Sequence, residues 1–204
     1  NKSEESLKGV FENLDEIMSY NQYKVLSAFQ ECRISDMHFA WNTGYGYDDP
    51  GRAARERVCA QIFSTEAALV RPTIVNGTHA LASVYLGILR PGDELMYCSG
   101  KPYDTMETII GLRDTGQGSL KDYGVTYRQV ELGENGKLDI PAIVAAISDK
   151  TRMVSVQRAT GYSFRKPIDL EQIREWVTAC KKRKPDIICM TDNCYGEFTQ
   201  VIEP

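Results

Sequence analysis

The sequence predicts an α/β fold in which helices flank a mostly parallel sheet. Short apolar runs typical of buried strands alternate with amphipathic stretches of helical length, and polar residues follow several of the apolar runs. Strands separated by helices of this length are joined by right-handed crossovers and therefore run parallel. Ligands of such sheets bind at the carboxyl ends of the strands, so the polar strand ends are the first places to look for a site.

A helical segment is expected before this alternating region. Its apolar residues recur at helical spacing in two runs, a pattern typical of a core or a subunit interface. The runs are Leu7, Val10, Phe11, Leu14, Ile17 and Met18, then Tyr23, Val25, Leu26, Phe29 and Ile34. Residues 39–51 are rich in glycine, aromatic and aspartate residues, which predicts a loop. We therefore expect a helical segment and loop over residues 1–50 and a larger domain over 51–204.

Helices and strands are expected to alternate after residue 51. Helices are predicted over 52–63, 77–88, 103–112, 140–147 and 170–183. Strands are predicted over 67–70, 73–75, 94–98, 125–132, 153–157 and 187–190. In the helix over 77–88, the side chains expected to face inward are Leu81, Val84, Tyr85 and Ile88.

Composition excludes several classes of protein. The chain has 204 residues, of which 42% are hydrophobic and 25% charged, so it can form one sizeable core. Its net charge is -4 and the charges are scattered, which argues against a nucleic-acid or anionic membrane surface. The basic run 181–184 closes a predicted helix, where cations suit the helix dipole. With no apolar run of spanning length and no signal peptide, we expect a cytoplasmic protein.

The six cysteines form no CxxC pair and lie mostly in apolar segments. They are therefore expected to be reduced, buried thiols of a cytoplasmic protein. Only His38 and His79 could join them as metal ligands, and neither has ligand-like spacing, so no metal site is expected.

One candidate site opens the helix predicted from residue 77. Gly77, Thr78 and His79 stand where free N–H groups and the helix dipole favour an anion such as phosphate. A hydroxyl at a helix start is also a common cap, and this simpler reading stays open.

Two further candidates follow predicted strands. Tyr103, at the entry to a helix, could lie flat on a planar cofactor or could serve as an N-terminal staple. Gln157 and Arg158 end the strand over 153–157 and could place an amide or a guanidinium over the site, although ordinary strand termination explains them equally well.

The last candidate is Asp192, directly after the apolar run 187–190. A carboxylate at the end of a buried strand is costly unless a cation meets it, so Asp192 could pair with a positively charged ligand. It could also cap the segment that follows, and Thr191 and Asn193 need no ligand.

Six uncommon strings occur in an order that resembles the methionine gamma-lyase family, also called the aluminium resistance protein family, of fold-type I pyridoxal-phosphate enzymes. They are TGYGYDD (43–49), NGTHA (76–80), LRPGDE (89–94), PYDT (102–105), GSLKDYG (118–124) and DNCYGEF (192–198). The resemblance runs from about residue 39 to the end and is looser before it. It implies that residues 51–204 are an incomplete large domain that binds pyridoxal 5'-phosphate, and that the carboxyl-terminal part is missing.

The resemblance also implies roles for individual residues. Gly77, Thr78 and His79 would hold the cofactor phosphate, Tyr103 would stack on the ring, and Asp192 would pair with the ring nitrogen so that the ring withdraws electrons. Gln157 and Arg158 would lie near the ring hydroxyl or the substrate. The loop with Tyr45, Tyr47 and Arg52 would reach the phosphate site of a neighbouring subunit, which requires a homodimer or homotetramer.

Two parts of the family pattern are absent. The lysine that holds the cofactor as a Schiff base follows the strand-end aspartate in the family, and this chain has no lysine after Lys184. Lys101, Lys121 and Lys166 precede Asp192 and do not match that motif. The small domain that supplies an arginine for the substrate carboxylate is missing too. We therefore expect the amino-terminal part of a longer enzyme, inactive by itself.

Three functions remain open at this stage. The first is a carbon-sulfur lyase that uses pyridoxal phosphate on a sulfur-containing amino acid. The second is another elimination or aminotransfer reaction with the same cofactor, and the third is a non-catalytic binding or oligomerisation module. A dinucleotide site is disfavoured because no glycine fingerprint follows a predicted strand.

Overall fold

The computed structural model describes residues 2–47, 49–113 and 116–204. The chain forms two compact units, and each is described by itself. Unit 1 comprises Asn1–Ile74 and Glu197–Glu203, and unit 2 comprises Val75–Gly196 with Pro204. The expected division between residues 1–50 and 51–204 remains a prediction. Within the described ranges, no helix is long and apolar enough to cross a membrane.

Unit 1 is helical. It contains α1 (Lys2–Glu31), the short 3-10 helix η1 (Asp36–Phe39) and α2 (Pro50–Ile62). The two apolar runs expected at the amino terminus thus lie on one continuous helix, except for Ile34, which follows its end. α2 begins where Asp49 accepts a hydrogen bond from the backbone N–H of Arg52 (2.9 Å), with proline in the first turn.

The core of unit 1 is small. Ala28 of α1 packs with Val58 and Ile62 of α2, and these three side chains are buried. The distal part of α1 has an exposed apolar face, formed by Leu7, Val10, Phe11, Leu14 and Met18. The end of the chain joins this unit because the Asn21 amide donates to the carbonyl oxygens of Phe198 (3.1 Å) and Gln200 (3.0 Å).

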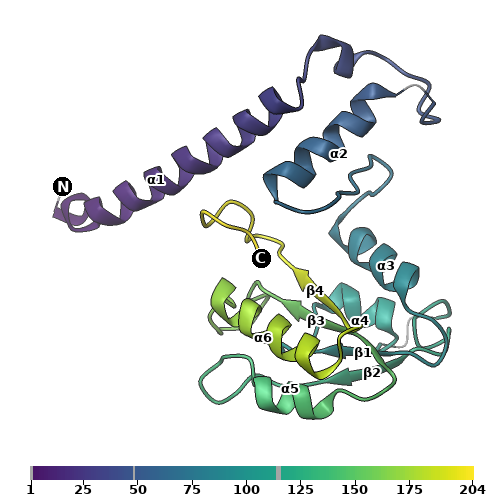
Figure 1. Cartoon of the computed structure of the whole chain (residues 1–204). Coiled ribbons are helices and arrows are strands. Elements are labelled where there is room, and N and C mark those ends of the chain that lie inside the picture. Colours follow the sequence, from purple (N-terminus) through teal and green to yellow (C-terminus); the bar gives the residue numbers. More distant parts are fainter. Residues whose placement is uncertain (1, 48, 114–115) are drawn as a thin grey trace. The chain divides into compact units, whose positions relative to one another are not determined.

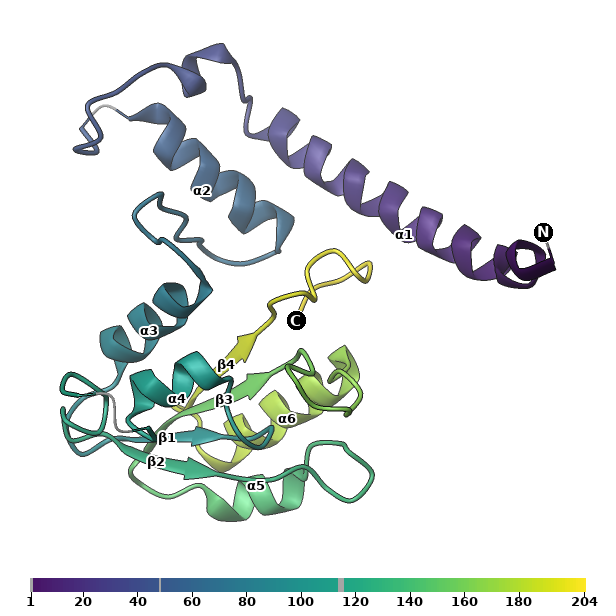
Figure 2. The same cartoon turned by 180° about the vertical axis from the view of Figure 1, so that it is seen from behind.

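Unit 2 is built on a four-stranded sheet, as Figures 1 and 2 show. Its strands are β1 (Glu94–Tyr97), β2 (Thr126–Gln129), β3 (Thr151–Gln157) and β4 (Ile188–Asp192). Within the described residues the order is β2-β1-β3-β4 and every neighbouring pair is parallel. The predicted α/β class with a parallel sheet is therefore confirmed.

Helices cover both faces of this sheet (Figure 2). The helices are α3 (Gly77–Ile88), α4 (Asp104–Ile110), α5 (Ile140–Ala146) and α6 (Leu170–Arg183). Side chains alternate along the strands, so Met96 and Val154 pack in one core with α5 and α6. Leu95 and Met153 face the other core, which α3 and α4 complete. All four helices match the predicted ones within about two residues, a usual margin for helix ends.

Three sequence expectations were wrong in detail. Residues 67–70 and 73–75 form no strand, because the backbone of Val70 bonds instead to the side chains of Arg55 and Glu56 on α2. Tyr85 faces the core as expected, but Val84 is 39% exposed, because Ala82 and Tyr85 set the buried face of α3. All six cysteines are free thiols, but only Cys98 and Cys180 are fully buried, and Cys194 is exposed.

Candidate functional site

Most of the predicted site residues of unit 2 come together at the carboxyl edge of its sheet. Gln157 and Asp192 are register partners at the ends of the neighbouring strands β3 and β4. Tyr103 follows β1 and enters α4, and it is joined to Gln157 by a hydrogen bond. The crossovers of a parallel sheet bring these positions together, as expected for a ligand site in this fold.

The amino terminus of α3 provides the anion-type feature. Asn76 caps the helix by accepting from the N–H of His79 (2.8 Å), and the imidazole Nδ1 of His79 accepts from the N–H of Val75 (3.3 Å). The Thr78 hydroxyl bonds to that of Thr105 on α4 (2.9 Å). A Cβ built on Gly77 would meet nothing within 4 Å, so space is open beside the first turn. A helix amino terminus with space beside its first turn suits a phosphate.

Tyr103 is held at both ends. Its backbone N–H donates to Oε1 of Gln157 (3.1 Å), and its hydroxyl bonds to that of Tyr162 (3.0 Å). The two rings stack with centroids 5.6 Å apart at 25°. The hydrogen bond to Tyr162 is the main cause that raises the pKa of Tyr103 to about 12, so its hydroxyl stays protonated at neutral pH.

Gln157 and Arg158 hold the loops that surround this edge. The Gln157 amide donates to the carbonyl oxygen of Ala159 (3.2 Å) in addition to accepting from Tyr103. The buried guanidinium of Arg158 donates to Oδ1 of Asn193 (2.7 Å) and to the carbonyl oxygen of Gly196 (3.2 Å). A Cβ on Gly196 would overlap with that guanidinium, so the Arg158 side chain passes close to the backbone there. Arg158 thus clamps the turn that follows Asp192.

Asp192 is half-buried at the end of β4, and its Oδ1 accepts from the N–H of Cys194 (3.1 Å). Nearby, the buried hydroxyls of Tyr85 and Tyr97 bond to each other (2.6 Å), and Tyr85 also bonds to Ser155 (3.3 Å). Burial raises the pKa of Tyr97 well above its usual value, and the negative charge of Asp192 raises it further. Asp192 therefore stands beside hydroxyl groups that stay neutral at neutral pH.

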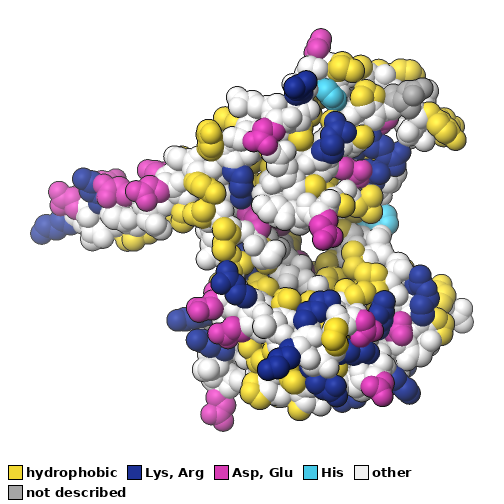
Figure 3. All heavy atoms as spheres, viewed as in Figure 1, with side chains coloured by type: hydrophobic (Ala, Val, Ile, Leu, Met, Phe, Trp, Pro, Cys, Tyr) yellow, Lys and Arg dark blue, Asp and Glu magenta, His cyan; other side chains and the backbone are white. Residues whose placement is uncertain are grey.

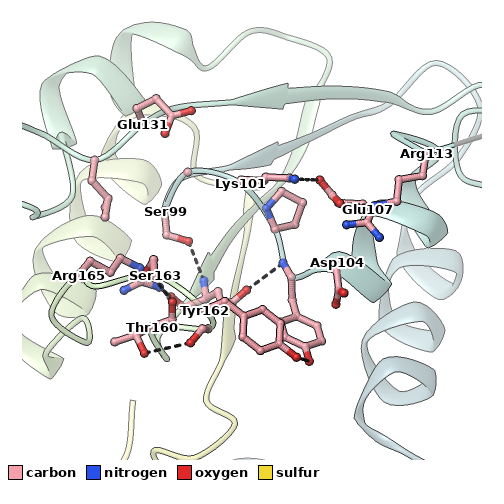
Figure 4. A pocket seen from close by; sticks show the side chains of 16 residues that line it. Ser99, Lys101, Asp104, Glu107, Arg113, Glu131, Thr160, Tyr162, Ser163 and Arg165 are labelled. Atoms are coloured by element: carbon pink, nitrogen blue, oxygen red, sulfur yellow. Dashed lines mark hydrogen bonds and ion pairs between the residues drawn. The ribbon is translucent and has the colours of Figure 1, made fainter.

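A pocket of about 520 Å³ opens beside Tyr103 in unit 2 (Figure 4). In its wall the buried carboxylate of Glu107 pairs with Lys101 (2.7 Å) and Arg113 (2.5 Å). The hydrogen bond from Lys101 is the largest cause that lowers the pKa of Glu107, and Arg113 lowers it further. The Arg165 guanidinium donates to the carbonyl oxygens of Gln157 (2.8 Å) and Lys166 (3.1 Å). Glu107 and Arg165 in this wall thus have charged or polar partners within the chain itself.

Tyr47 and Arg52 lie in unit 1, where Tyr47 is 79% exposed. Asp48, which belongs to the string 43–49, lies outside the described residues. In the part of the chain that is described, no three His, Cys, Asp or Glu side chains come together as a metal site.

Several hydrogen-bond partners of the site residues were not predicted from the sequence. Thr105 and Tyr162 contact Thr78 and Tyr103 across 27 and 59 residues of chain. Tyr162 follows Gly161 shortly after the end of β3, and an aromatic residue after a strand end is a signal that could have drawn attention to it. The Tyr85–Tyr97–Ser155 network carried no such signal, because buried aromatic residues are normally core.

Comparison with known proteins places the chain in a family. The family model described as methionine gamma-lyase matches residues 1–204. The uncharacterised protein YnbB of Bacillus subtilis is 44% identical over 98% of this chain and 48% of its own length. A solved carbon-sulfur lyase involved in aluminium resistance, from Clostridium novyi, is 43% identical with a TM-score of 0.95, over 100% of this chain and 49% of that one.

A more distant structure shares the fold alone. It is the apo form of a methionine gamma lyase from Micromonospora echinospora, 19% identical with a TM-score of 0.51, over 72% of this chain and 33% of that one.

Together the parallel sheet, its two helical layers and the ligand-type strand edge define the large domain of the fold-type I pyridoxal-phosphate enzymes. More specifically, the chain belongs to the methionine gamma-lyase family, as the six sequence strings predicted. It spans about half the length of the relatives that it matches.

Proposed function

We propose that this chain is part of a pyridoxal-phosphate-dependent carbon-sulfur lyase that acts on a sulfur-containing amino acid. The observation that supports it most is the grouping of Tyr103, Gln157 and Asp192 at one sheet edge, with the start of α3 linked to α4 through Thr78. The printed name of the Clostridium novyi relative, a carbon-sulfur lyase, agrees with this reaction class.

The residues fit the cofactor. The first turn of α3 offers N–H groups and the Thr78 hydroxyl beside open space, which suits a phosphate. Tyr103 offers an aromatic ring, one face of which lies against Tyr162. Asp192 offers a carboxylate at the strand end, which suits a protonated ring nitrogen. When bound, pyridoxal phosphate supplies an electron sink for a carbanion at the substrate alpha carbon.

The chain's own residues then have distinct tasks. The Asp192 carboxylate keeps the proton on the ring nitrogen by charge attraction, which is strong in a half-buried site. Gln157 positions Tyr103 by accepting its backbone N–H, and Tyr103 covers the ring and excludes water. Arg158 orients the turn after Asp192 through Asn193. Together these contacts orient the cofactor before a substrate arrives.

The proposal has requirements outside these residues. The lysine that carries the cofactor must come from beyond this chain, as no lysine follows Lys184. Tyr47 and Arg52 are proposed to reach the phosphate site of a second copy, so the enzyme would be a homodimer or homotetramer. The proposed location is the cytoplasm.

The direct test uses the complete protein purified with added pyridoxal phosphate. We expect the visible absorbance band of the lysine-bound cofactor, which borohydride reduction should remove. We also expect a thiol and a 2-oxo acid to be released from at least one sulfur-containing amino acid. A cofactor band with only amino-group transfer would favour an aminotransferase, and absence of the band would refute the proposal.

Asp192→Asn tests the central residue. We expect kcat to fall by about 10²-fold or more, because an electrostatic partner of the reacting system is lost. The fold should persist, since Asn is isosteric. Asp149→Asn, on the exposed turn before β3, is the matched control and should leave kcat unchanged. An equal loss of kcat in both variants, or unfolding of Asp192→Asn, would show that Asp192 has a structural role and not the proposed one.

A further inference from the structure

One side of the amino-terminal half of α1 is apolar and exposed. Its residues follow one another in steps of four, three and four, and each is between 45% and 61% exposed: Leu7, Phe11, Leu14 and Met18. We call these four residues the distal stripe. Alternating steps of three and four residues are the spacing with which two helices pack along a common seam. Figure 3 shows acidic and basic side chains gathered along the upper side of this part of α1.

The distal stripe continues into a seam that the chain itself covers. After Met18 the same steps lead to Asn21, Val25 and Ala28. Val25 and Ala28 pack with α2, and Asn21 is 5% exposed and donates to the carbonyl oxygen of Phe198. Packing against another part of the protein is thus already the use of this side of α1, and it stops where the distal stripe begins.

Two charged residues flank the distal stripe on one side. Lys8 and Asp15 lie seven residues apart, each directly after a leucine of the stripe. Lys8 has an ion pair with Glu12 of the same helix (3.7 Å), but the two side chains are 76% and 63% exposed, so this pair is weak. Charges beside an apolar helix seam select the partner and its direction.

A second α1 that runs antiparallel would cover the stripe. Leu7 would lie opposite Met18 of the second copy, and Phe11 would lie opposite Leu14. These pairs are reciprocal, as in the isologous contact of a twofold dimer. The exposed apolar surface of both helices would leave water together, which favours the association.

The flanking charges are complementary in this arrangement and not in the parallel one. Lys8 of each copy would face Asp15 of the other, which gives two ion pairs. A parallel pair would instead place Asp15 opposite the apolar Val10 and Lys8 opposite Ser3. Because both charges lie on α1 itself, a second copy is the partner that supplies them in the matching positions.

We propose that the distal stripe of α1 binds the distal stripe of a second copy as an antiparallel helix pair. The contact gives the proposed homo-oligomer a particular surface and orientation, and it rests on no part of the proposed chemistry. The competing cover for the stripe is the remainder of the complete protein, since this chain spans about half the length of its relatives. The experiment separates the two.

The test measures the self-association of the complete protein, purified with added pyridoxal phosphate, by sedimentation velocity over a dilution series. Leu14→Glu should raise the dissociation constant of the assembly at least about tenfold, because the pair would bury two carboxylates among apolar side chains. Asn13→Glu adds the same charge to the same turn outside the stripe and should leave the association unchanged.

Charge reversal tests the partner and the direction. Lys8→Glu and Asp15→Lys should each weaken the association by about tenfold, since like charges would face each other in two places. The double variant restores opposite charges and should return the dissociation constant to within about threefold of the wild-type value. Both residues are exposed, so these variants keep the test valid if Leu14→Glu fails to fold.

A monomeric wild type, an unchanged association of Leu14→Glu, or no recovery in the double variant would overturn the inference. Loss of thermal stability in Leu14→Glu at an unchanged mass would also overturn it, and would assign the stripe to the remainder of the same chain. The cofactor band is read in the same samples. A band with unchanged association would retain the proposed lyase without the helix pair, and weakened association without a band would retain the pair without the lyase.

Discussion

One pocket in unit 2, of about 520 Å³, and one in unit 1, of about 540 Å³ and lined by Arg52, Arg55 and Arg71, are similar in volume but differ in how their charged side chains are paired. In unit 2 the Glu107 carboxylate pairs with Lys101 and Arg113. In unit 1 Arg52 and Arg55 have no such carboxylate among the described residues, and Arg71 is paired only with Glu56.

A charged side chain in a pocket wall can have two different effects on stability and binding. A charge that the chain neutralises itself stabilises the wall of a site, and its removal costs free energy of unfolding. A charge left in excess destabilises the unliganded protein slightly and becomes favourable when a ligand neutralises it. The same substitution, a charged residue to its neutral counterpart, should therefore have opposite consequences in the two pockets.

The largest expected effect is in the unit-2 wall. Glu107→Gln should lower the free energy of unfolding by about 2 kcal/mol, because a buried carboxylate loses charge-assisted bonds to Lys101 and Arg113. Urea denaturation at neutral pH measures it. Glu134→Gln, in an exposed turn, is the control and should change little. A loss as small as the control's would show that this pairing is not stabilising.

The Glu107 carboxylate should also make the free energy of unfolding depend on pH. The pKa of Glu107 is lowered in the folded state, so its contribution is complete above the ordinary glutamate pKa of about 4.3. It is lost as the pH falls through the lower folded-state pKa. The stability difference between the wild type and Glu107→Gln should therefore shrink in acid. A constant difference down to the acid transition would contradict the lowered pKa.

A smaller effect, of opposite sign, is expected in unit 1. Arg52→Gln without any added oxyanion should leave the free energy of unfolding unchanged or raise it by about 0.5 kcal/mol, since it removes a cation from a helix start. The measurement is thermal unfolding in a phosphate-free buffer, with Arg57→Gln, which changes an exposed arginine of the same helix, as the control. If the free energy of unfolding falls by more than about 1 kcal/mol, the folded protein already neutralises the charge of Arg52. The two pockets would then not differ in how their charges are paired.

The smallest effect concerns a hydrogen bond in the unit-2 pocket. Tyr162→Phe should lower the pKa of Tyr103 from about 12 towards the usual value of about 10, because the Tyr162 bond is the main cause of the increase. Alkaline difference absorbance, referenced to Tyr103→Phe, measures it. Tyr123→Phe removes another exposed tyrosine as a control. An unchanged Tyr103 titration would show that the stacked pair does not persist in solution.

Local sequence signals predicted most of the architecture. The helix over 170–183 has the predicted bounds because its apolar spacing, its Asp169 cap and its basic last turn all agree. Strands were harder where short apolar runs were ambiguous. Residues 67–70 look extended, but the side chains of Arg55 and Glu56 bond to the backbone of Val70, which no local pattern shows.

The candidate site was predictable only in part, for the same reason. Asp192 and Gln157 were identified because a polar residue at the end of an apolar strand is visible in the local sequence. The parallel topology then places both strand ends at the same edge of the sheet. The partners of these residues were not predictable. Thr105, Tyr162 and the Tyr85–Tyr97 pair depend on how crossovers and loops are placed.

The sequence by itself determined the α/β class, the order of helices and strands from residue 77 onward and the family, since periodicity, caps and motif strings are local features of the chain. Only the tertiary structure decided how each charge is compensated. Arg71 meets Arg52 and Arg55, and Glu107 meets Lys101, through distances that the loop geometry sets. Coulomb energy depends on distance and burial, and the order of residues specifies neither.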